Sequence, residues 1–160
     1  MRHHGKEGSL HTKIGYNWRM SEINAILGIY QLRRLDEFLV KRNHVANRYA
    51  QELNDLKNLT LISVPSNIRH SFWKYPILLN SIKASHLEKI FREKYEIALG
   101  TVYFPPIHLQ PFYKEKFGFS SGMLPVSEDV LSRETCLPIF ADISEEMIDN
   151  VIKCIRMELK

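Results

Sequence analysis

The chain has 160 residues, of which 44% are hydrophobic and 25% are charged, and it carries a formal net charge of +4. These values indicate one soluble globular domain, with or without a small appendage, that is large enough to bury a core. A membrane span is excluded because no run approaches ~18 apolar residues, and Cys136 and Cys154 fit neither a disulfide-rich scaffold nor a metal-binding pair.

Residues 1–20 predict a loop that ends in a turn before a helix. Residues 1–13 are polar and glycine-containing, which is typical of a loop or a frayed end. The turn, Gly15–Glu22, combines aromatic, amide and guanidinium side chains. Unpaired N–H groups and a partial positive charge at a helix N-terminus suit an anion such as phosphate, and Asn17 and Arg19 add side-chain donors. The sequence therefore predicts half of an anion-binding site here.

Residues 21–56 predict a long connecting helix. Ser21 is suited to be its N-cap, and Glu22 favours the helix dipole. No proline lies between Ser21 and Val64, so we expect one very long helix or two helices joined by a kink near residues 32–36. The apolar residues that recur at helical spacing are Ile23, Ile26, Leu27, Tyr30, Leu35, Phe38, Leu39, Val45, Ala46, Tyr49, Leu53 and Leu56.

Residues 57–160 predict a small α+β layer of strands and helices that follows the long connecting helix. We expect strands at residues 59–64 and 97–103, and a turn at residues 65–67. Residues 72–79 predict a third strand, and Pro76 places it at an edge or a bulge because proline has no N–H to donate.

Three helices are expected in the same domain, separated by an ordered, proline-rich loop at residues 104–122. Residues 85–94 begin with a capping box formed by Ser85 and Glu88. Residues 125–133 predict a short helix. The terminal helix, residues 144–159, has Ser144 as its cap and a buried stripe of Ile148, Val151, Ile152 and Ile155.

Few residues point to chemistry. His108 differs from the other histidines because three prolines in residues 103–111 fix the backbone around it, although a structural role stays an alternative. His3, His4 and His11 lie in the polar start, where a flexible end is favoured over a metal site. We find no metal signature, no nucleophile motif, no glycine-rich phosphate loop and no carboxylates paired in a setting that would raise a pKa.

The basic residues of the long helix predict a solvated face. They are interspersed with Asp36 and Glu37, which disfavours a nucleic-acid site. His44 and Arg48 lie among polar neighbours and are assigned to a solvated or interfacial face.

Several segments follow one another in an order that is more specific than any one of them. They are Arg2–Gly5, Gly15–Ala25, Gln31–Leu32, Leu35–Asp36, Arg42, Tyr49, His70–Trp73, Tyr103–Pro111 and Leu137–Ile139. In this order they resemble the C-terminal part of the DegT/DnrJ/EryC1/StrS family, the sugar aminotransferases that depend on pyridoxal phosphate. The resemblance covers nearly the whole chain. It implies the aspartate-aminotransferase-like fold (fold type I), in which a small C-terminal α+β domain follows a large domain and a long helix, so that the intact protein is α/β.

The resemblance also implies that the Schiff-base lysine of the large domain lies before this sequence, because neither Lys6 nor Lys13 matches the family's lysine motif. The aspartate that pairs with the pyridine nitrogen is missing as well. Covalent chemistry of this kind needs the lysine to hold the cofactor and to shuttle the proton. We therefore expect no catalytic residue here, no stable binding of pyridoxal 5'-phosphate by this chain alone and no transamination by it.

Four site residues follow from the resemblance. Asn17 matches an asparagine that reaches the cofactor phosphate bound to the neighbouring subunit of a homodimer, and Arg19 matches the arginine near the nucleotide-sugar phosphates or the dimer contact. Tyr103 and His108 match the loop that borders the sugar substrate. Two departures from the family pattern are Trp18, in place of the more usual tyrosine, and Val102, where many members have histidine. The structural alternatives are that Asn17 caps a turn and that Arg19 pairs with an acidic neighbour.

Two functions are weighed. In the first, the chain is the C-terminal portion of an enzyme that moves an amino group from an amino acid, glutamate by expectation, onto a keto-sugar attached to a nucleotide. In the second, it is a non-catalytic truncated or split-gene remnant that serves as a dimerisation or binding module. Neither nucleic acid nor a membrane is an expected partner, because the charge is modest and mixed. The start has no apolar signal-peptide core, so we expect a cytoplasmic protein.

Overall fold

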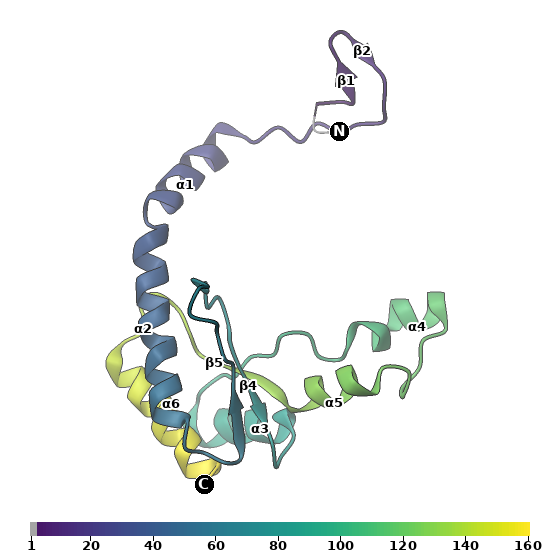
Figure 1. Cartoon of the computed structure of the whole chain (residues 1–160). Coiled ribbons are helices and arrows are strands. Elements are labelled where there is room, and N and C mark those ends of the chain that lie inside the picture. Colours follow the sequence, from purple (N-terminus) through teal and green to yellow (C-terminus); the bar gives the residue numbers. More distant parts are fainter. Residues whose placement is uncertain (1–2) are drawn as a thin grey trace. The chain divides into compact units, whose positions relative to one another are not determined.

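The computed structural model describes residues 3–160, so Arg2, which belongs to the first matching segment, lies outside the described residues. The chain divides into two compact units, of which the first ends at Glu37 and the second is Phe38–Lys160. Figure 1 shows the elements of both units in chain order. None of the helices in residues 3–160 has both the length and the apolar character that crossing a membrane requires.

The first unit begins with a short hairpin where the sequence predicted a loop. Strand β1 (Lys6–Glu7) pairs antiparallel with β2 (Leu10–His11). The two residues between them begin with Gly8, whose φ of 61° suits the tight turns that join adjacent strands. With two residues in each strand, the hairpin is too short to show the alternation of apolar and polar residues by which strands are recognised.

Helix α1 (Glu22–Arg33) begins as predicted. The Ser21 hydroxyl oxygen accepts a hydrogen bond from the backbone N–H of Asn24 at 3.3 Å. The helix is capped at its other end by Arg34, and helix α2 (Leu35–Leu53) follows directly. The break lies inside the 32–36 stretch, so the structure has the pair of helices and not the single uninterrupted helix.

Helix α1 has apolar side chains on two opposite sides, whereas the sequence predicted one stripe. At 100° per residue, Ile29 and Leu32 lie on the side opposite to Ile23 and Leu27. No residue of α1 is buried in the described chain. Apolar side chains on opposite sides of a helix are typical of a helix that is covered on more than one side in a larger protein.

Residues 38–160 contain an antiparallel sheet in the order β3-β4-β5. It consists of β3 (Leu59–Leu61), β4 (Tyr75–Leu79) and β5 (Glu134–Leu137). The first two strands confirm the predictions near residues 59–64 and 72–79, although both are shorter. The turn at residues 65–67 is also present, because the N–H of Ile68 bonds to the carbonyl of Pro65 at 3.0 Å.

The prediction that Pro76 marks an edge or a bulge is wrong, because β4 is the central strand. Pro76 lies opposite Cys136 of β5. The pairing of β4 with β3 does not include Pro76, because its last pair is Ile77 with Leu61, one residue after Pro76 in the chain. On that side no ladder bond is lost at Pro76, which explains how a central strand accommodates a proline.

The core of the second unit lies between the sheet and three helices: α2, α3 (Ala84–Tyr95) and α6 (Glu145–Glu158). In Figure 1, α6 runs beside the C-terminal half of α2. The predicted apolar stripe of α6 is confirmed, and that of α2 is confirmed from Val45 onward, whereas Leu35 is exposed. The fully or nearly fully buried residues of this core include Val45, Ala46, Tyr49, Leu53, Ile77, Leu79, Leu87, Phe91, Ile148, Val151, Ile152 and Ile155.

The predicted strand at residues 97–103 is wrong. Only Gly100 pairs with the sheet, through an isolated bridge in which its N–H bonds to the carbonyl of Cys136 at 3.1 Å. Ile97 and Leu99 pack against the core from an irregular segment, so their apolar character reports burial and not strand pairing. The sheet position is taken instead by β5, whose four residues are all buried and which the sequence did not predict.

The helices of the second unit differ from the predictions in two details. Helix α3 is present, but the capping box is wrong, because Lys83 is the N-cap and no side chain caps it. The predicted loop at residues 104–122 contains a 3-10 turn, η1 (Ile107–Leu109), and a short helix, α4 (Pro111–Phe117). Helix α5 (Pro125–Arg133) and helix α6, capped by Ser144, are as predicted.

Candidate functional site

The loop that carries Asn17 and Arg19 is held by backbone contacts. The N–H of His4 bonds to the carbonyl of Tyr16 at 3.1 Å, and His3 forms an isolated antiparallel bridge with Asn17. The carbonyl of Gly5 accepts hydrogen bonds from the N–H groups of residues 12 and 13 at 3.1 and 3.3 Å. The two ends of the 3–17 segment are therefore closed onto each other. The predicted turn at residues 15–22 is wrong, because residues 18–21 form no turn and lead as an irregular segment into α1.

Two glycines make this closure possible. A Cβ on Gly15 would lie 1.9 Å from the backbone nitrogen of Gly5, and a Cβ on Gly5 would lie 1.9 Å from the carbonyl oxygen of Lys13. Gly5 also has a φ of 67°, which other residues rarely adopt. The loop is thus fixed by backbone against backbone, with its side chains left to face outward.

Asn17 and Arg19 are both exposed and differ in their contacts. The Asn17 side chain has no hydrogen-bond partner among residues 3–160, so its amide is available to a ligand. Arg19 donates from Nη2 to Nδ1 of His3 at 2.8 Å. Tyr16 and Trp18 stack on each other beside them, with ring centroids 4.6 Å apart and an interplanar angle of 7°. The predicted acidic partner of Arg19 is replaced by a histidine.

The Arg19 contact requires a neutral His3, because Nδ1 has to accept a hydrogen bond. The guanidinium of Arg19 is the main cause that lowers the pKa of His3 below its ordinary value of 6.5, with smaller contributions from burial, Lys6 and the neighbouring histidines. The contact is therefore complete above pH 6.5 and is lost as the pH falls through the lowered pKa.

We expect Arg19→Gln to raise the pKa of His3 towards 6.5, because the substitution removes the positive charge that disfavours the imidazolium. The measurement is an NMR pH titration of the His3 imidazole. Lys6→Gln serves as a control with a smaller effect, because Lys6 contributes less to the shift. An unchanged His3 titration in Arg19→Gln would contradict the contact.

Tyr103 and His108 come together in the second unit. Both line a groove of about 440 Å³, which has mostly apolar walls and to which Tyr113 and Phe119 also contribute. The Tyr103 side chain is exposed, whereas His108 is buried and donates from Nε2 to Oε1 of Glu128 at 3.0 Å. The structure therefore unites two residues that the resemblance assigned to one loop.

Glu128 is the residue that holds this loop, and sequence reasoning missed it. Its carboxylate accepts hydrogen bonds from the backbone N–H groups of Gly122 at 2.9 Å and Leu124 at 3.3 Å, from the Ser121 hydroxyl at 2.9 Å and from His108. The Gly122 N–H first, and then His108, lower the pKa of Glu128 to about 2. An available signal was the acidic residue in the first turn of a helix that starts with proline, where free N–H groups attract a carboxylate.

Glu88 corrects the expectation that no carboxylate is paired in a setting that raises its pKa, because burial, the largest cause, and the charge of Glu134 both raise it. Burial raises the pKa of Glu88 above its ordinary value, and Thr135 and Arg92 oppose this shift. Nearby, the buried Glu134 accepts hydrogen bonds from the N–H of Val102 at 3.0 Å and from Sγ of Cys136 at 3.1 Å. Burial also raises the pKa of the Cys136 thiol to about 12, so this group stays protonated and unreactive.

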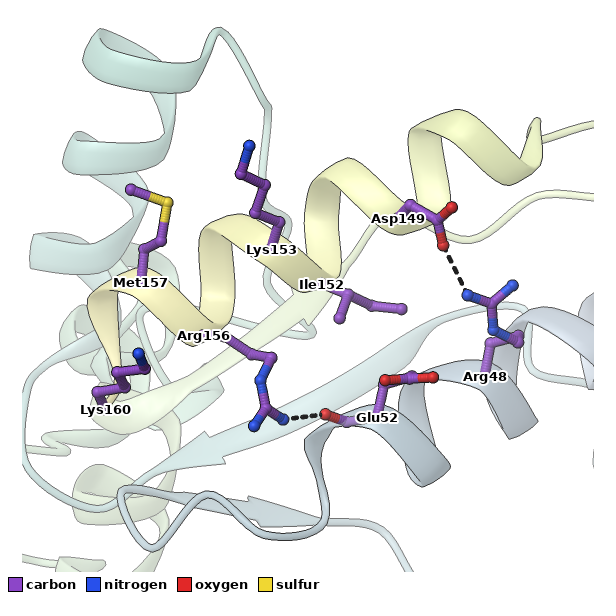
Figure 2. A pocket seen from close by; sticks show the side chains of 8 residues that line it. All are labelled: Arg48, Glu52, Asp149, Ile152, Lys153, Arg156, Met157 and Lys160. Atoms are coloured by element: carbon purple, nitrogen blue, oxygen red, sulfur yellow. Dashed lines mark hydrogen bonds and ion pairs between the residues drawn. The ribbon is translucent and has the colours of Figure 1, made fainter.

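The charged groove in Figure 2 lies between α2 and α6 and is not assigned chemistry. Arg48 of α2 contacts Asp149 of α6 at 2.6 Å, and Arg156 of α6 contacts both oxygens of Asp55 at 2.7 Å. These arginines point at carboxylates across the groove and tie the two helices together. His44 does the same through Glu145 at 2.7 Å, which places the predicted His44 and Arg48 face at a helix interface.

Metal binding has no support in the described part of the chain. Residues 3–160 contain no group of three or more His, Cys, Asp or Glu side chains that lie close enough together to hold a metal ion. His3 and His4 lie side by side with ring centroids 5.7 Å apart, and His3 is already bonded to Arg19. The described residues therefore offer two separate candidate sites, the Asn17 loop in the first unit and the Tyr103–His108 groove in the second.

Longer proteins contain regions similar to this chain. The profile of the DegT/DnrJ/EryC1/StrS aminotransferase family matches residues 1–156. Spore coat polysaccharide biosynthesis protein SpsC of Bacillus subtilis is 31% identical over 145 residues, which cover 89% of this chain and 37% of that protein. GDP-perosamine synthase of Escherichia coli O157:H7 is 30% identical over 146 residues, covering 91% of this chain and 38% of that protein. A solved DegT DnrJ EryC1 StrS aminotransferase from Brucella abortus matches 98% of this chain and 40% of its own chain, at 28% identity and a TM-score of 0.81.

Proposed function

Because the chain belongs to the DegT/DnrJ/EryC1/StrS aminotransferase family and has the small C-terminal α+β domain of fold type I, we propose that it serves a nucleotide-sugar aminotransferase. In this proposal residues 1–160 contact the phosphate of pyridoxal 5'-phosphate through Asn17 and border the sugar through Tyr103 and His108. The intact enzyme is a homodimer that moves an amino group, with glutamate as donor, onto a keto-sugar attached to a nucleotide. The observation that carries the proposal is the unpartnered Asn17 amide on a loop that its own backbone holds rigid.

The donors around Asn17 fit the phosphate end of the cofactor. An amide N–H₂ and a guanidinium are hydrogen-bond donors, and both are exposed on the irregular segment that precedes α1. Arg19 keeps its planar guanidinium oriented through His3, so one edge is fixed while the remaining N–H groups are free to donate. The role of these residues is to bind and orient the phosphate.

The lysines of the same unit do not fit covalent attachment of the cofactor. Lys13 forms an exposed ion pair with Glu7 at 3.1 Å, and Lys6 lies on the exposed strand β1. A lysine that attacks an aldehyde is normally desolvated or placed beside another cation, so that its amine is neutral. When bound, the cofactor supplies the electron sink for amino transfer. We propose that the lysine and the proton transfers come from the large domain of the enzyme, not from residues 1–160.

Asn17→Ala tests this role in the assembled aminotransferase. We expect pyridoxal 5'-phosphate to bind about tenfold more weakly, because one hydrogen bond to a charged oxygen is lost. Equilibrium titration of the cofactor by its absorbance measures the change. Asn24→Ala is the matched control, since Asn24 is also an exposed asparagine of this unit but lies on α1. Equal affinity in the wild type and Asn17→Ala would refute the phosphate contact.

The isolated chain provides the complementary measurement. We expect no stoichiometric covalent adduct when it is mixed with pyridoxal 5'-phosphate, reduced with borohydride and analysed by mass spectrometry. Modification of one specific lysine to completion would contradict the proposal that the chain depends on the lysine of a large domain.

The alternative function, a non-catalytic dimerisation or binding module, is favoured by a different observation. Helix α1 exposes apolar side chains on two opposite sides, which suits a helix that is covered by another protein. The two functions differ in one outcome. A module needs no cofactor, so a partner protein that covers α1 without creating a binding site for pyridoxal 5'-phosphate would favour the module.

A further inference from the structure

Helix α4 and the residue after its cap carry a ladder of aromatic rings. Tyr113 and Phe117 stack with centroids 6.1 Å apart at 20°, and Phe117 and Phe119 stack with centroids 5.7 Å apart at 30°. Phe112 stands edge-on to Tyr113 at 88°. Tyr113, Phe117 and Phe112 are exposed by 38%, 55% and 60%. Flat aromatic faces in a row at a surface are suited to stacking against the flat rings of a ligand.

Two lysines accompany the ladder. The Nζ atom of Lys116 lies 5.3 Å from the ring centroid of Phe112 and 5.7 Å from that of Phe117. Within residues 3–160, neither Lys114 nor Lys116 has a carboxylate partner. Their positive charges are therefore uncompensated, whereas the arginines of the α2–α6 groove are each paired. A ligand that complements this surface has an aromatic ring and a negative charge.

The ladder continues into the groove that contains Tyr103 and His108. Tyr113 and Phe119, the two ends of the ladder, line that groove, and its walls are largely apolar. A nucleotide sugar is a single molecule, in which a diphosphate joins the sugar to the nucleoside. If the sugar lies against Tyr103 and His108, its nucleoside has to lie close by, and the ladder is the neighbouring surface that suits a base.

We propose that the aromatic ladder of Tyr113, Phe117 and Phe119 binds the nucleobase of the nucleotide-sugar substrate, and that Lys114 and Lys116 bind its diphosphate. This inference rests on the proposed function, because it extends the sugar-bordering groove to the other half of the same substrate. Stacking accepts any base, since every base has a π-face. The diphosphate contact is electrostatic and lies at an exposed surface, so it weakens as salt is added.

The test measures the binding of uridine, thymidine and guanosine diphosphates to the whole chain by NMR. We expect the amide signals of residues 112–119 to shift on addition of nucleotide. Phe117→Ala is expected to weaken binding about tenfold through the loss of stacking. Lys116→Gln is expected to weaken binding and to reduce its dependence on salt. The matched controls are Phe140→Ala and Lys153→Gln, an exposed aromatic residue and a lysine outside the ladder, and both are expected to bind as the wild type does.

Three outcomes overturn the inference. Nucleotide binding that is equal in Phe117→Ala and the wild type places the base elsewhere, and the proposed function then still stands. Absence of any nucleotide binding also overturns the ladder, and the proposed function is then judged by the cofactor titration of Asn17→Ala, which involves no nucleotide. If Phe117→Ala changes the oligomeric state and leaves nucleotide binding unchanged, the ladder is a contact between protein chains.

Discussion

Replacing Tyr49 with alanine is expected to lower the free energy of unfolding of the chain by about 3–5 kcal/mol, the usual cost of truncating a buried aromatic residue. Tyr49 is 0% exposed and packs against Tyr75, with ring centroids 5.2 Å apart. Its hydroxyl donates to the carbonyl of Pro138 at 2.8 Å, and burial raises its pKa, so the donor keeps its proton. The side chain thus connects α2 to both the sheet and the segment after β5. Urea unfolding followed by far-ultraviolet circular dichroism measures the loss.

Two further variants separate the contributions of the ring and the hydroxyl. Tyr49→Phe keeps the ring and leaves the Pro138 carbonyl without its donor, so we expect a loss of about 1–2 kcal/mol. Tyr103→Ala removes an exposed tyrosine of the same unit and should change the stability by less than about 0.5 kcal/mol. A loss below about 1 kcal/mol in Tyr49→Ala would show that the core can be formed without this residue.

Glu128→Gln is expected to release the segment before α5. The carboxylate holds two backbone N–H groups, the Ser121 hydroxyl and the His108 imidazole, and an amide can neither match its charge nor accept at both ends. We expect the amide protons of Gly122 and Leu124 to exchange with solvent at least about tenfold faster. Hydrogen exchange followed by NMR measures this. Glu115→Gln on α4 is the matched control, because the Glu115 carboxylate has no partner in the described chain.

The same carboxylate gives the loop a defined pH dependence. The pKa of Glu128 is lowered to about 2 from an ordinary value of 4.5. A lowered carboxyl pKa means that the contribution of Glu128 is complete above pH 4.5 and is lost as the pH falls through about 2. We therefore expect the backbone amide signals of Gly122 and Leu124, whose N–H groups the carboxylate accepts, to stay native at pH 4 and to change only near pH 2. Loss of these signals at pH 4, with the core of the second unit still folded, would contradict this assignment.

The parts of the fold that depend on local signals could be predicted from the sequence. Helix α5 starts with a proline and α6 has a serine cap, and in both the apolar residues recur at helical spacing within the helix itself. Strands depend on their neighbours. Pro76 suggested an edge because nothing local shows that the pairing with β3 does not include it. Residues 97–99 are apolar because they pack on the core, and β5 begins with Glu134 and Thr135, whose burial depends on hydrogen bonds to distant residues.

The candidate site divides in the same way. The donors of Asn17 and Arg19 could be recognised because they are close in the sequence, although the predicted turn is absent, and Tyr103 and His108 followed from a resemblance. Glu128 lies twenty residues after His108 and meets it only because the chain reverses between α4 and α5 (Figure 1). The aromatic ladder was also missed, since residues 112–119 show a stacked face only when they form a helix.

The close backbone contact between Gly5 and Gly15 holds the Asn17 loop, whereas the exposed side chains of the loop form the surface that a ligand meets. Two positions have to remain without a side chain, and Tyr16 and Asn17 close the loop through their backbone while their side chains stay at the surface. Substitutions in this segment therefore have different consequences at the two kinds of position. Exchange of Trp18 for tyrosine alters the surface that a ligand meets and leaves the course of the chain intact, whereas one added methyl group at residue 15 displaces the backbone itself. For protein engineering, the loop is a rigid frame in which the displayed residues can be changed one at a time.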